Sequence, residues 1–315
     1  KGYSELMKLS IVTTLYKSSP YVDEFYERIS KEAQKITDNY EIIFVDDGSP
    51  DDSLQKCITL HQQDKKVTVI ELSRNFGHHK AIMTGLSHAQ GDFVFLIDVD
   101  LEEEPELLGK FWEELQNGED LDVVYGVQRA RKGGWFEKVT GDLFYRLCNK
   151  IAHIKLPKNA ITCRLTTSQY NKALISHQES EIFLLGLWVI SGFNQKGVYV
   201  KKYSTSDTTY NARRKISLLF NFLTSFSSFP LKIIFYIGFT ISFVSSTYIT
   251  WIVIQKIFFD VSLEGWTSLI VSIWFLGGVM LLSIGVIGIY ISKIFSETKQ
   301  RPNTIIRKKY EACDE

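Results

Sequence analysis

The chain has 315 residues, and its 36 Lys and Arg balance 36 Asp and Glu, so the formal net charge is zero. Binding to a nucleic-acid backbone normally needs a basic excess, so the composition argues against nucleic acid as a partner. The cysteines show no metal-ligand spacing, which predicts reduced cytosolic thiols at Cys57, Cys148, Cys163 and Cys313.

Short apolar runs alternate with amphipathic stretches through the first 126 residues. The runs are rich in Ile, Val and Phe and lack polar alternation, which is typical of parallel strands buried on both faces. They lie at 9–15, 41–45, 67–72, 93–98 and 122–126. Amphipathic helices are expected between them, at 21–35, 53–63, 78–89 and 105–115. This alternation predicts an α/β fold with a doubly wound sheet.

The chain changes character after this half. Residues 127–212 mix charges, glycines and aromatic residues, and we expect them to complete the same domain. Residues 213–230 predict a basic-to-apolar amphipathic helix suited to a membrane surface. The apolar segments 231–254 and 267–291 would each be roughly 36 Å long as helices, enough to cross a hydrocarbon core of ~30 Å. We therefore expect a transmembrane hairpin over 231–292, followed by a basic tail at 293–315.

Charges flank this predicted hairpin asymmetrically. Lys and Arg gather before it, at 213–215 and 232, and after it, between 293 and 309, whereas the connecting loop has Lys256 against Asp260 and Glu264. By the positive-inside rule, both ends of the hairpin face the cytoplasm. We expect a multi-pass protein of the bacterial plasma membrane, with the α/β domain and both termini cytoplasmic.

Charged side chains follow the ends of three predicted strands. Asp46 and Asp47 follow the second strand, Arg74 the third, and Asp98 and Asp100 the fourth. Ligands of open α/β sheets bind beyond the carboxyl ends of the strands, so these side chains should gather at one rim. Two Asp separated by one residue can hold a hard divalent cation that in turn binds a diphosphate.

Each of these motifs also has a purely structural interpretation. The acidic stretch 98–104 could favour the N-terminus of the next helix, residues 46–49 could form a turn with a helix cap, and Arg74 could be a surface residue. Their concentration at one rim favours binding of a nucleotide and its phosphates. His78 and His79 are interpreted as helix-start residues, because adjacent residues of a helix point to different faces.

Five motifs carry a resemblance to a known family: 10–16 (Ser-Ile-Val-Thr-Thr-Leu-Tyr), 45–49 (Val-Asp-Asp-Gly-Ser), 73–77 (Ser-Arg-Asn-Phe-Gly), 98–100 (Asp-Val-Asp) and 124–127 (Val-Tyr-Gly-Val). They resemble the family 2 glycosyltransferases of the GT-A fold. Segments at 143–146, 164–165, 224–227, 265–269 and 275–278 extend the resemblance to the branch of dolichyl-phosphate-mannose synthase and the bactoprenol glucosyltransferases. This implies a nucleoside-diphosphate sugar as donor, with a UDP-sugar favoured, a polyprenyl phosphate as acceptor, Mg²⁺ or Mn²⁺, and a homo-oligomer such as a tetramer.

The resemblance also implies roles for individual residues of this chain. Donor binding falls to Thr13, Tyr16, Asp46, Asp47, Arg74, Asp98 and Arg129. The metal ligands are Asp100 and Glu102. The predicted catalytic residues are Asp100, Arg131 and Arg164, and Glu103 joins them only as the nearest acid in the sequence.

The chain departs from the family pattern at two informative places. Thr162 stands where the family's Gly-Asp-Phe-Arg-Leu has an active-site Asp, and Thr209 replaces a lysine of Gly-x-Thr-Lys-Tyr. Both fall in the part that is expected to recognise sugar and acceptor. We therefore expect altered substrate choice with the donor chemistry intact.

The expected reaction is an inverting transfer to polyprenyl phosphate, for cell-surface glycan or O-antigen modification. A phosphate acceptor is already ionised, so it needs little help from a base. A hydroxyl of a lipid-linked saccharide would need one, and Glu103 is the nearest candidate by sequence. A processive polysaccharide synthase is a weaker alternative, because no Gln-x-x-Arg-Trp motif is present. A non-catalytic membrane scaffold would not need the acidic rim.

Overall fold

The computed structural model describes residues 7–128, 157–179, 181–201, 229–259 and 265–311. The chain forms two compact units, and each is considered by itself. One comprises residues 1–146, 154–209 and 301–315, and the other comprises 147–153 and 210–300.

The first unit is built on an eight-stranded mixed sheet in the order β7-β5-β6-β4-β1-β2-β3-β8. The strands are β1 (Leu9–Leu15), β2 (Tyr40–Asp46), β3 (Val67–Leu72), β4 (Phe93–Leu96), β5 (Val123–Gln128), β6 (Ala160–Thr167), β7 (Gln195–Val200) and β8 (Ile306–Tyr310). The five strands predicted from the sequence all run in the same direction. β6 pairs antiparallel with both β4 and β5, so β5 keeps the direction of β4 without lying beside it.

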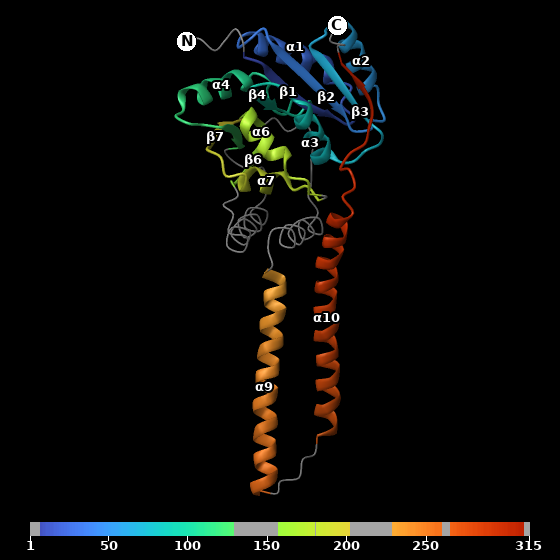
Figure 1. Cartoon of the computed structure of the whole chain (residues 1–315), viewed down its shortest axis with the longest axis vertical. Coiled ribbons are helices and arrows are strands. Elements are labelled where there is room, and N and C mark those ends of the chain that lie inside the picture. The colour runs from blue at the N-terminus through green and yellow to red at the C-terminus, as the bar shows by residue number, and fades with distance from the viewer. Residues whose placement is uncertain (1–6, 129–156, 180, 202–228, 260–264, 312–315) are drawn as a thin grey trace. The chain divides into compact units, whose positions relative to one another are not determined.

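Helices cover both faces of this sheet, as the doubly wound prediction requires (Figure 1). Their bounds are α1 (Val22–Gln34), α2 (Ser53–Gln63), α3 (His78–His88), α4 (Leu107–Asn117), α6 (Ser168–Ile175) and α7 (Leu184–Ile190). Helices α1, α2 and α4 share one apolar core with the sheet, whereas α3, α6 and α7 share the other. Two apolar layers of this kind explain why β1 is buried along its whole length.

The strand order creates a switch point next to β1. Successive connections place β2 and then β3 on one side of β1, and the chain then returns to add β4 on the other side. At such a point the connections leave the sheet in opposite directions, which opens a crevice at the carboxyl ends of the two central strands. The ends of β1 and β4 therefore mark the expected ligand-binding region.

The last strand was not expected from the sequence, which assigned residues 293–315 only to a basic tail. Instead, β8 pairs antiparallel with β3 and completes that edge of the sheet (Figure 1). Because β8 depends on pairing across more than 230 residues, its local sequence of basic residues gave no strand signal. The sheet is consequently mixed, with two antiparallel strands, rather than wholly parallel.

The second unit contains two long helices, α9 (Phe229–Phe259) and α10 (Trp266–Thr298). Among the described residues, one helical stretch is long and apolar enough to cross a membrane: Ser272–Thr298, with a mean hydropathy of 2.1. α9 contains a shorter apolar stretch, Pro230–Ser245. Two membrane spans are therefore not established, and the predicted amphipathic helix lies almost entirely outside the described residues.

Candidate active site

The polar residues that follow the central strands meet at the carboxyl rim of the sheet. The backbone ties the rim together beyond the strands, since Asp47 N donates to Leu15 O at 3.0 Å and Ile97 N donates to Val12 O at 3.2 Å. The ends of β2 and β4 are thereby held against β1 on either side. The acids that follow β2 and β4 therefore flank the switch point, as the sequence predicted.

Asp46 is a buried carboxylate at the end of β2, with 2% of its surface exposed. Burial raises its pKa to about 6, and backbone N–H groups of Ser49 and Gly48 oppose this effect. Glu71 lies directly across from it on β3 and adds a further repulsion between carboxylates. An acid with this pKa is ionised at neutral pH and can accept hydrogen bonds from the donor groups of a nucleoside.

Asp47 holds the neighbouring loop in place. Its two carboxylate oxygens accept hydrogen bonds from Phe76 N at 2.7 Å and Gly77 N at 2.9 Å. Gly48, with a φ of 65°, lies so close to this loop that a Cβ would stand 2.7 Å from backbone atoms of Arg74 and Asn75. Only glycine fits both the positive φ and the close approach. The turn after β2 therefore supports the loop after β3.

That loop presents Arg74 to solvent. Its guanidinium lies over the ring of Phe76, 4.1 Å from the centroid, and donates to Asn75 O at 3.0 Å. An exposed arginine held on a fixed loop is well suited to meet a phosphate or a base. Its position agrees with the predicted donor-binding role, which stays a prediction.

His78 bridges the two sides of the switch point. Its Nδ1 lies 3.1 Å from Thr14 Oγ1 at the end of β1, and its Nε2 lies 3.5 Å from Asp98 Oδ1 after β4. Sequence reasoning correctly placed His78 at a helix start but missed this contact. Its place in the first turn of α3, whose N-terminus follows the rim loop, was the available signal. His79 instead contacts Ile182 O at 3.1 Å, on a different element.

The acidic segment after β4 forms a tight turn. Asp100 Oδ1 accepts a hydrogen bond from Glu102 N at 3.0 Å, and Leu101 between them adopts a φ of 57°. A bulky residue rarely takes this left-handed conformation, so the turn stores strain that its surroundings must hold. Leu101 packs against the core below, which supplies that support.

The oxygens of this turn fit a hard cation. Among the described residues, no three His, Cys, Asp or Glu side chains group closely enough to form a metal site unaided. Mg²⁺ usually binds through one or two carboxylates together with substrate phosphates, so a pair such as Asp100 and Glu102 suits it. The predicted metal ligands thus fit a cation that arrives with a diphosphate.

Glu103 follows the acidic turn, and its predicted role as a general base stays a prediction. Its side chain is fully buried, with none of its surface exposed. Thr13 is also fully buried, and its hydroxyl bonds no group among the described residues. Its neighbour Thr14 makes the rim contact, and Tyr16 is half exposed just beyond β1.

Arg164 is buried within β6 rather than displayed at the rim. It donates from Nε to Thr162 O at 3.1 Å and from a terminal nitrogen to Ile161 O at 3.2 Å, and its guanidinium lies over the ring of Trp188. Burial lowers its pKa to about 10. This placement shows a guanidinium engaged with the protein itself, and its predicted contact with substrate remains untested.

Thr162 sits where β6 approaches the rim. Leu96 of β4 pairs with Arg164 as the last pair of the two strands, so Thr162 lies two residues beyond that pair, on the side of the carboxyl end of β4. The residue that replaces the family's Asp therefore belongs to the rim by register. Arg129, Arg131 and Thr209 lie outside the described residues.

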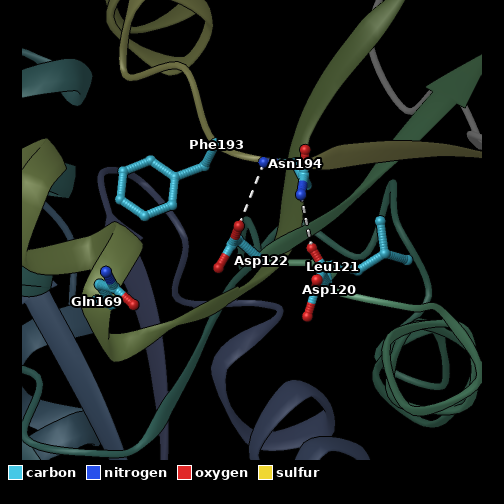
Figure 2. A pocket seen from close by; sticks show the side chains of 6 residues that line it. All are labelled: Asp120, Leu121, Asp122, Gln169, Phe193 and Asn194. Atoms are coloured by element: carbon cyan, nitrogen blue, oxygen red, sulfur yellow. Dashed lines mark hydrogen bonds between the residues drawn. The ribbon is translucent and has the colours of Figure 1, made fainter.

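A hollow of about 460 Å³ lies at the opposite, amino end of β5 (Figure 2). Asn194 N donates to Asp122 Oδ2 at 3.2 Å across it, and Asn194 Nδ2 donates to Asp120 O at 3.0 Å. Gln169 and Phe193 complete the wall. The Asp122 carboxylate and the Asp120 carbonyl are thus engaged with Asn194, and the hollow lies at the amino end of β5 rather than at the carboxyl rim where Asp98 follows β4.

Residues 10–177 match the model of Glycosyl transferase family 2, which covers more than half of the chain. The chain belongs to this family. A protein of Mycobacterium tuberculosis (strain CDC 1551 / Oshkosh) described as a glycosyltransferase is 52% identical over 96% of this chain and 89% of its own length. The prophage bactoprenol glucosyl transferase homolog of Escherichia coli (strain K12) is 33% identical over 96% of this chain and 99% of its own.

A solved structure of glucosyl-3-phosphoglycerate synthase from Mycobacterium tuberculosis, in complex with Mn²⁺, UDP and phosphoglyceric acid, is 16% identical. It covers 70% of this chain and 77% of its own, with a TM-score of 0.49.

The chain is therefore a glycosyltransferase, and the resemblance to the bactoprenol branch is confirmed by relatives that align along nearly its whole length. In this glycosyltransferase, the matched region 10–177 contains the whole rim from β1 to β4. It also contains Thr162, which stands where the family motif has an Asp. The long helices α9 and α10 and strand β8 follow the matched region 10–177, and the relatives align over these elements as well.

Proposed function

We propose that this glycosyltransferase transfers a sugar from a nucleoside diphosphate to a polyprenyl phosphate at the cytoplasmic face of a bacterial plasma membrane. A UDP-sugar is the favoured donor, and the anomeric configuration inverts. The feature that carries the proposal is the position of Asp46, Arg74, Asp98 and Asp100 at or after the ends of β2, β3 and β4, whose carboxyl ends share one rim with the switch point. Relatives named bactoprenol glucosyl transferase align over 96% of the chain and support a lipid phosphate as acceptor.

In this proposal, different residues of the rim bind different parts of the donor. Asp46 accepts hydrogen bonds from the nucleoside, and Arg74 offers its guanidinium to the phosphates or the base. Asp98, held by His78, serves the ribose. This division follows the chemistry of each group, since a carboxylate only accepts hydrogen bonds and a guanidinium only donates them.

Asp100 and Glu102 would hold Mg²⁺ or Mn²⁺ at the turn after β4. Bound there together with the diphosphate, the cation would neutralise the charge of the leaving group. The strained Leu101 sets the direction of both side chains, because it reverses the backbone between them. In this proposal the carboxylate of Asp100 is held by the turn before the donor arrives, which is a general requirement of electrostatic catalysis.

A phosphate is the favoured acceptor because it reacts without a general base. A phosphate oxygen of the acceptor attacks the anomeric carbon from the face opposite the diphosphate, the bond to the diphosphate breaks, and no proton has to be removed. The burial of Glu103 and the presence of Thr162 in place of an Asp both suit this reaction. Transfer to a hydroxyl of a lipid-linked saccharide is the second candidate, and Glu103 would then have to become accessible.

The apolar helices supply the surface on which such an acceptor lies. α10 is long and apolar enough to span a membrane, and exposed side chains such as Trp274 and Leu281 suit a lipid environment. We extend this to two spans, α9 and α10, with both termini cytoplasmic. A homo-oligomer, such as a tetramer, is part of the same proposal.

The test is incubation of membranes that contain the full chain with a panel of nucleotide sugars, undecaprenyl phosphate and Mg²⁺ or Mn²⁺. Mass spectrometry of the lipid extract should show a polyprenyl phosphate enlarged by one sugar, with release of the nucleoside diphosphate. Transfer only to an added lipid-linked saccharide would select the second candidate. Absence of any donor turnover with the whole panel would contradict the proposal.

A further inference from the structure

The C-terminal strand β8 lies against the strand that carries the Arg74 loop. It pairs antiparallel with β3, so the first residues of β8 lie beside the carboxyl end of β3. Residues 299–305 alone separate it from the end of α10. The segment that follows the apolar helices therefore enters the sheet at the catalytic rim.

A β-bulge in this pair redirects Arg307. Glu71 pairs with Lys308 and Leu72 pairs with Ile306, which leaves Arg307 as the extra residue between them. Bulges of this kind bend a strand and re-aim a side chain. The side chain of Arg307 therefore runs along the neighbouring strand, toward the loop that follows it.

Arg307 and the residue before β8 bond both polar groups of the Ser73 backbone. Arg307 donates to Ser73 O at 2.9 Å and to Glu71 Oε1 at 3.1 Å. Ser73 N in turn donates to Ile305 O at 2.8 Å. Ser73 is the residue immediately before Arg74, so these bonds fix the base of the loop.

A second contact ties the same segment to α3. The hydroxyls of Thr304 and Thr84 lie 2.7 Å apart, and Asn303 Nδ2 donates to Glu179 O at 3.2 Å. α3 begins with His78, which contacts Asp98 at the rim. The C-terminal segment therefore contacts the elements on both sides of the 73–77 loop.

The loop is thus held from two directions. Asp47 and Gly48 support one side of it from the turn after β2, and β8 supports its base through Ser73. We propose that Arg307 is a positioning residue for the donor site, which sets the place of Arg74 through the Ser73 carbonyl. This inference rests on the proposed use of Arg74 in nucleotide binding.

Charge supports the same role. Glu71 lies directly across from Asp46 in the sheet, and its charge acts on that carboxylate. Arg307 forms an ion pair with Glu71 at 3.1 Å and so offsets this charge. Arg307 therefore contributes a hydrogen bond to the base of the loop and a positive charge that compensates Glu71 beside Asp46.

The test measures binding of UDP in the presence of Mn²⁺ to the purified full chain in detergent by calorimetry. Arg307→Ala should weaken binding about fivefold, a modest loss because the guanidinium is partly exposed to solvent. The UDP affinity of Arg307→Lys should lie between those of the natural chain and Arg307→Ala, since an amine can reach only one of Glu71 and the Ser73 carbonyl. The matched control is Lys309→Ala, which removes the same charge from β8 but whose ammonium pairs with Glu311.

Kinetics and unfolding separate positioning from general structure. With the donor identified in the transfer assay, Arg307→Ala should raise the KM for donor while kcat and the thermal midpoint stay near those of the control. Unchanged UDP binding in Arg307→Ala, beside normal binding by the natural chain, would overturn the inference. Equal losses in Arg307→Ala and Lys309→Ala, or a lowered midpoint that accounts for the loss, would also overturn it. If the natural chain binds no UDP or other nucleoside diphosphate, the proposed function itself fails.

Discussion

Each half of the sheet buries an ionisable side chain that the sequence had assigned to the site, Asp46 in one half and Arg164 in the other, and their contacts differ. Asp46 at the rim formed by β1 to β4 accepts only long hydrogen bonds from Ser49 N, which lies 3.4 Å from Oδ1 and 3.3 Å from Oδ2. Arg164 in the β5–β7 half bonds two backbone carbonyls and lies over Trp188. Burial shifts the pKa of each toward the neutral form, to about 6 and about 10.

The difference teaches that a matching position in a family motif does not determine what a side chain contacts. Asp46 accepts long hydrogen bonds from Ser49 N, whereas Arg164 donates to two backbone carbonyls and packs against Trp188. The first half therefore resembles a site awaiting a donor. The second half holds its charge as part of its own packing. Four substitutions can break or sharpen this contrast.

The largest effect is expected for Asp100→Ala. Loss of this ligand removes the carboxylate that would share a cation with the diphosphate, and turnover should fall about a thousandfold. The measurement is donor consumption in membranes at saturating Mg²⁺ or Mn²⁺. Glu113→Ala, which removes an exposed acid from α4, is the control and should keep full turnover. Full metal-dependent turnover in Asp100→Ala would contradict the proposed site.

Arg164→Met should chiefly lower stability. It leaves the carbonyls of Ile161 and Thr162 without their donor and removes the contact with Trp188, at a cost of about 3 kcal/mol. Thermal unfolding of the purified chain measures this, with Lys172→Met on the surface of α6 as the control. A variant with normal stability but no transfer would instead place Arg164 in the substrate site, as the family motif implied.

Asp46→Asn should stabilise the protein at high pH while weakening donor binding. The folded-state pKa is about 6 against an ordinary value of 3.8, so the folded state binds the extra proton between these values. Stability therefore falls as pH rises through this window, and the cost of the buried charge persists above it. The variant should gain about 2 kcal/mol at pH 8 and almost nothing at pH 4.

Thermal midpoints at the two pH values test the stability part of this prediction. UDP binding at pH 8 tests whether Asp46→Asn weakens donor binding. Equal midpoints for the two proteins at pH 8 would show that Asp46 carries no burial cost.

His78→Ala should give the smallest of the four effects. It removes the contact that links Thr14 and Asp98 across the switch point, and the KM for donor should rise about tenfold. His79→Ala removes the adjacent imidazole, which contacts Ile182 O instead, and should leave the KM unchanged. Steady-state kinetics on both variants decides the point, and equal increases would contradict a specific role for His78.

Most of the first unit could be predicted because its signals are local. The runs that became β1 and β3 match their predicted bounds, and α2 matches as well, since apolar content and turn residues lie within each segment. The predicted strand 93–98 ended early, at Leu96, because the chain leaves the sheet to form the acidic turn. The order β5-β6-β4 could not be predicted, because it depends on which distant strand pairs with which.

The candidate site divides in the same way. The place of Asp46, Asp98 and Asp100 at one rim could be predicted because residues after parallel strands share that rim, whatever the details of packing. The burial of Glu103 and Arg164 was not found, since it depends on how side chains pack once the layers have formed.

The sequence alone determined the family, the direction of the five parallel strands and the acids at their ends, because each follows from motifs or from periodicity within a few residues. Only the tertiary structure decided that Asp47 holds the Arg74 loop, that His78 reaches Asp98, and that β8 closes the sheet beside β3. Those contacts join residues about 20 to more than 230 positions apart, and such pairings become favourable only when the whole sheet has assembled.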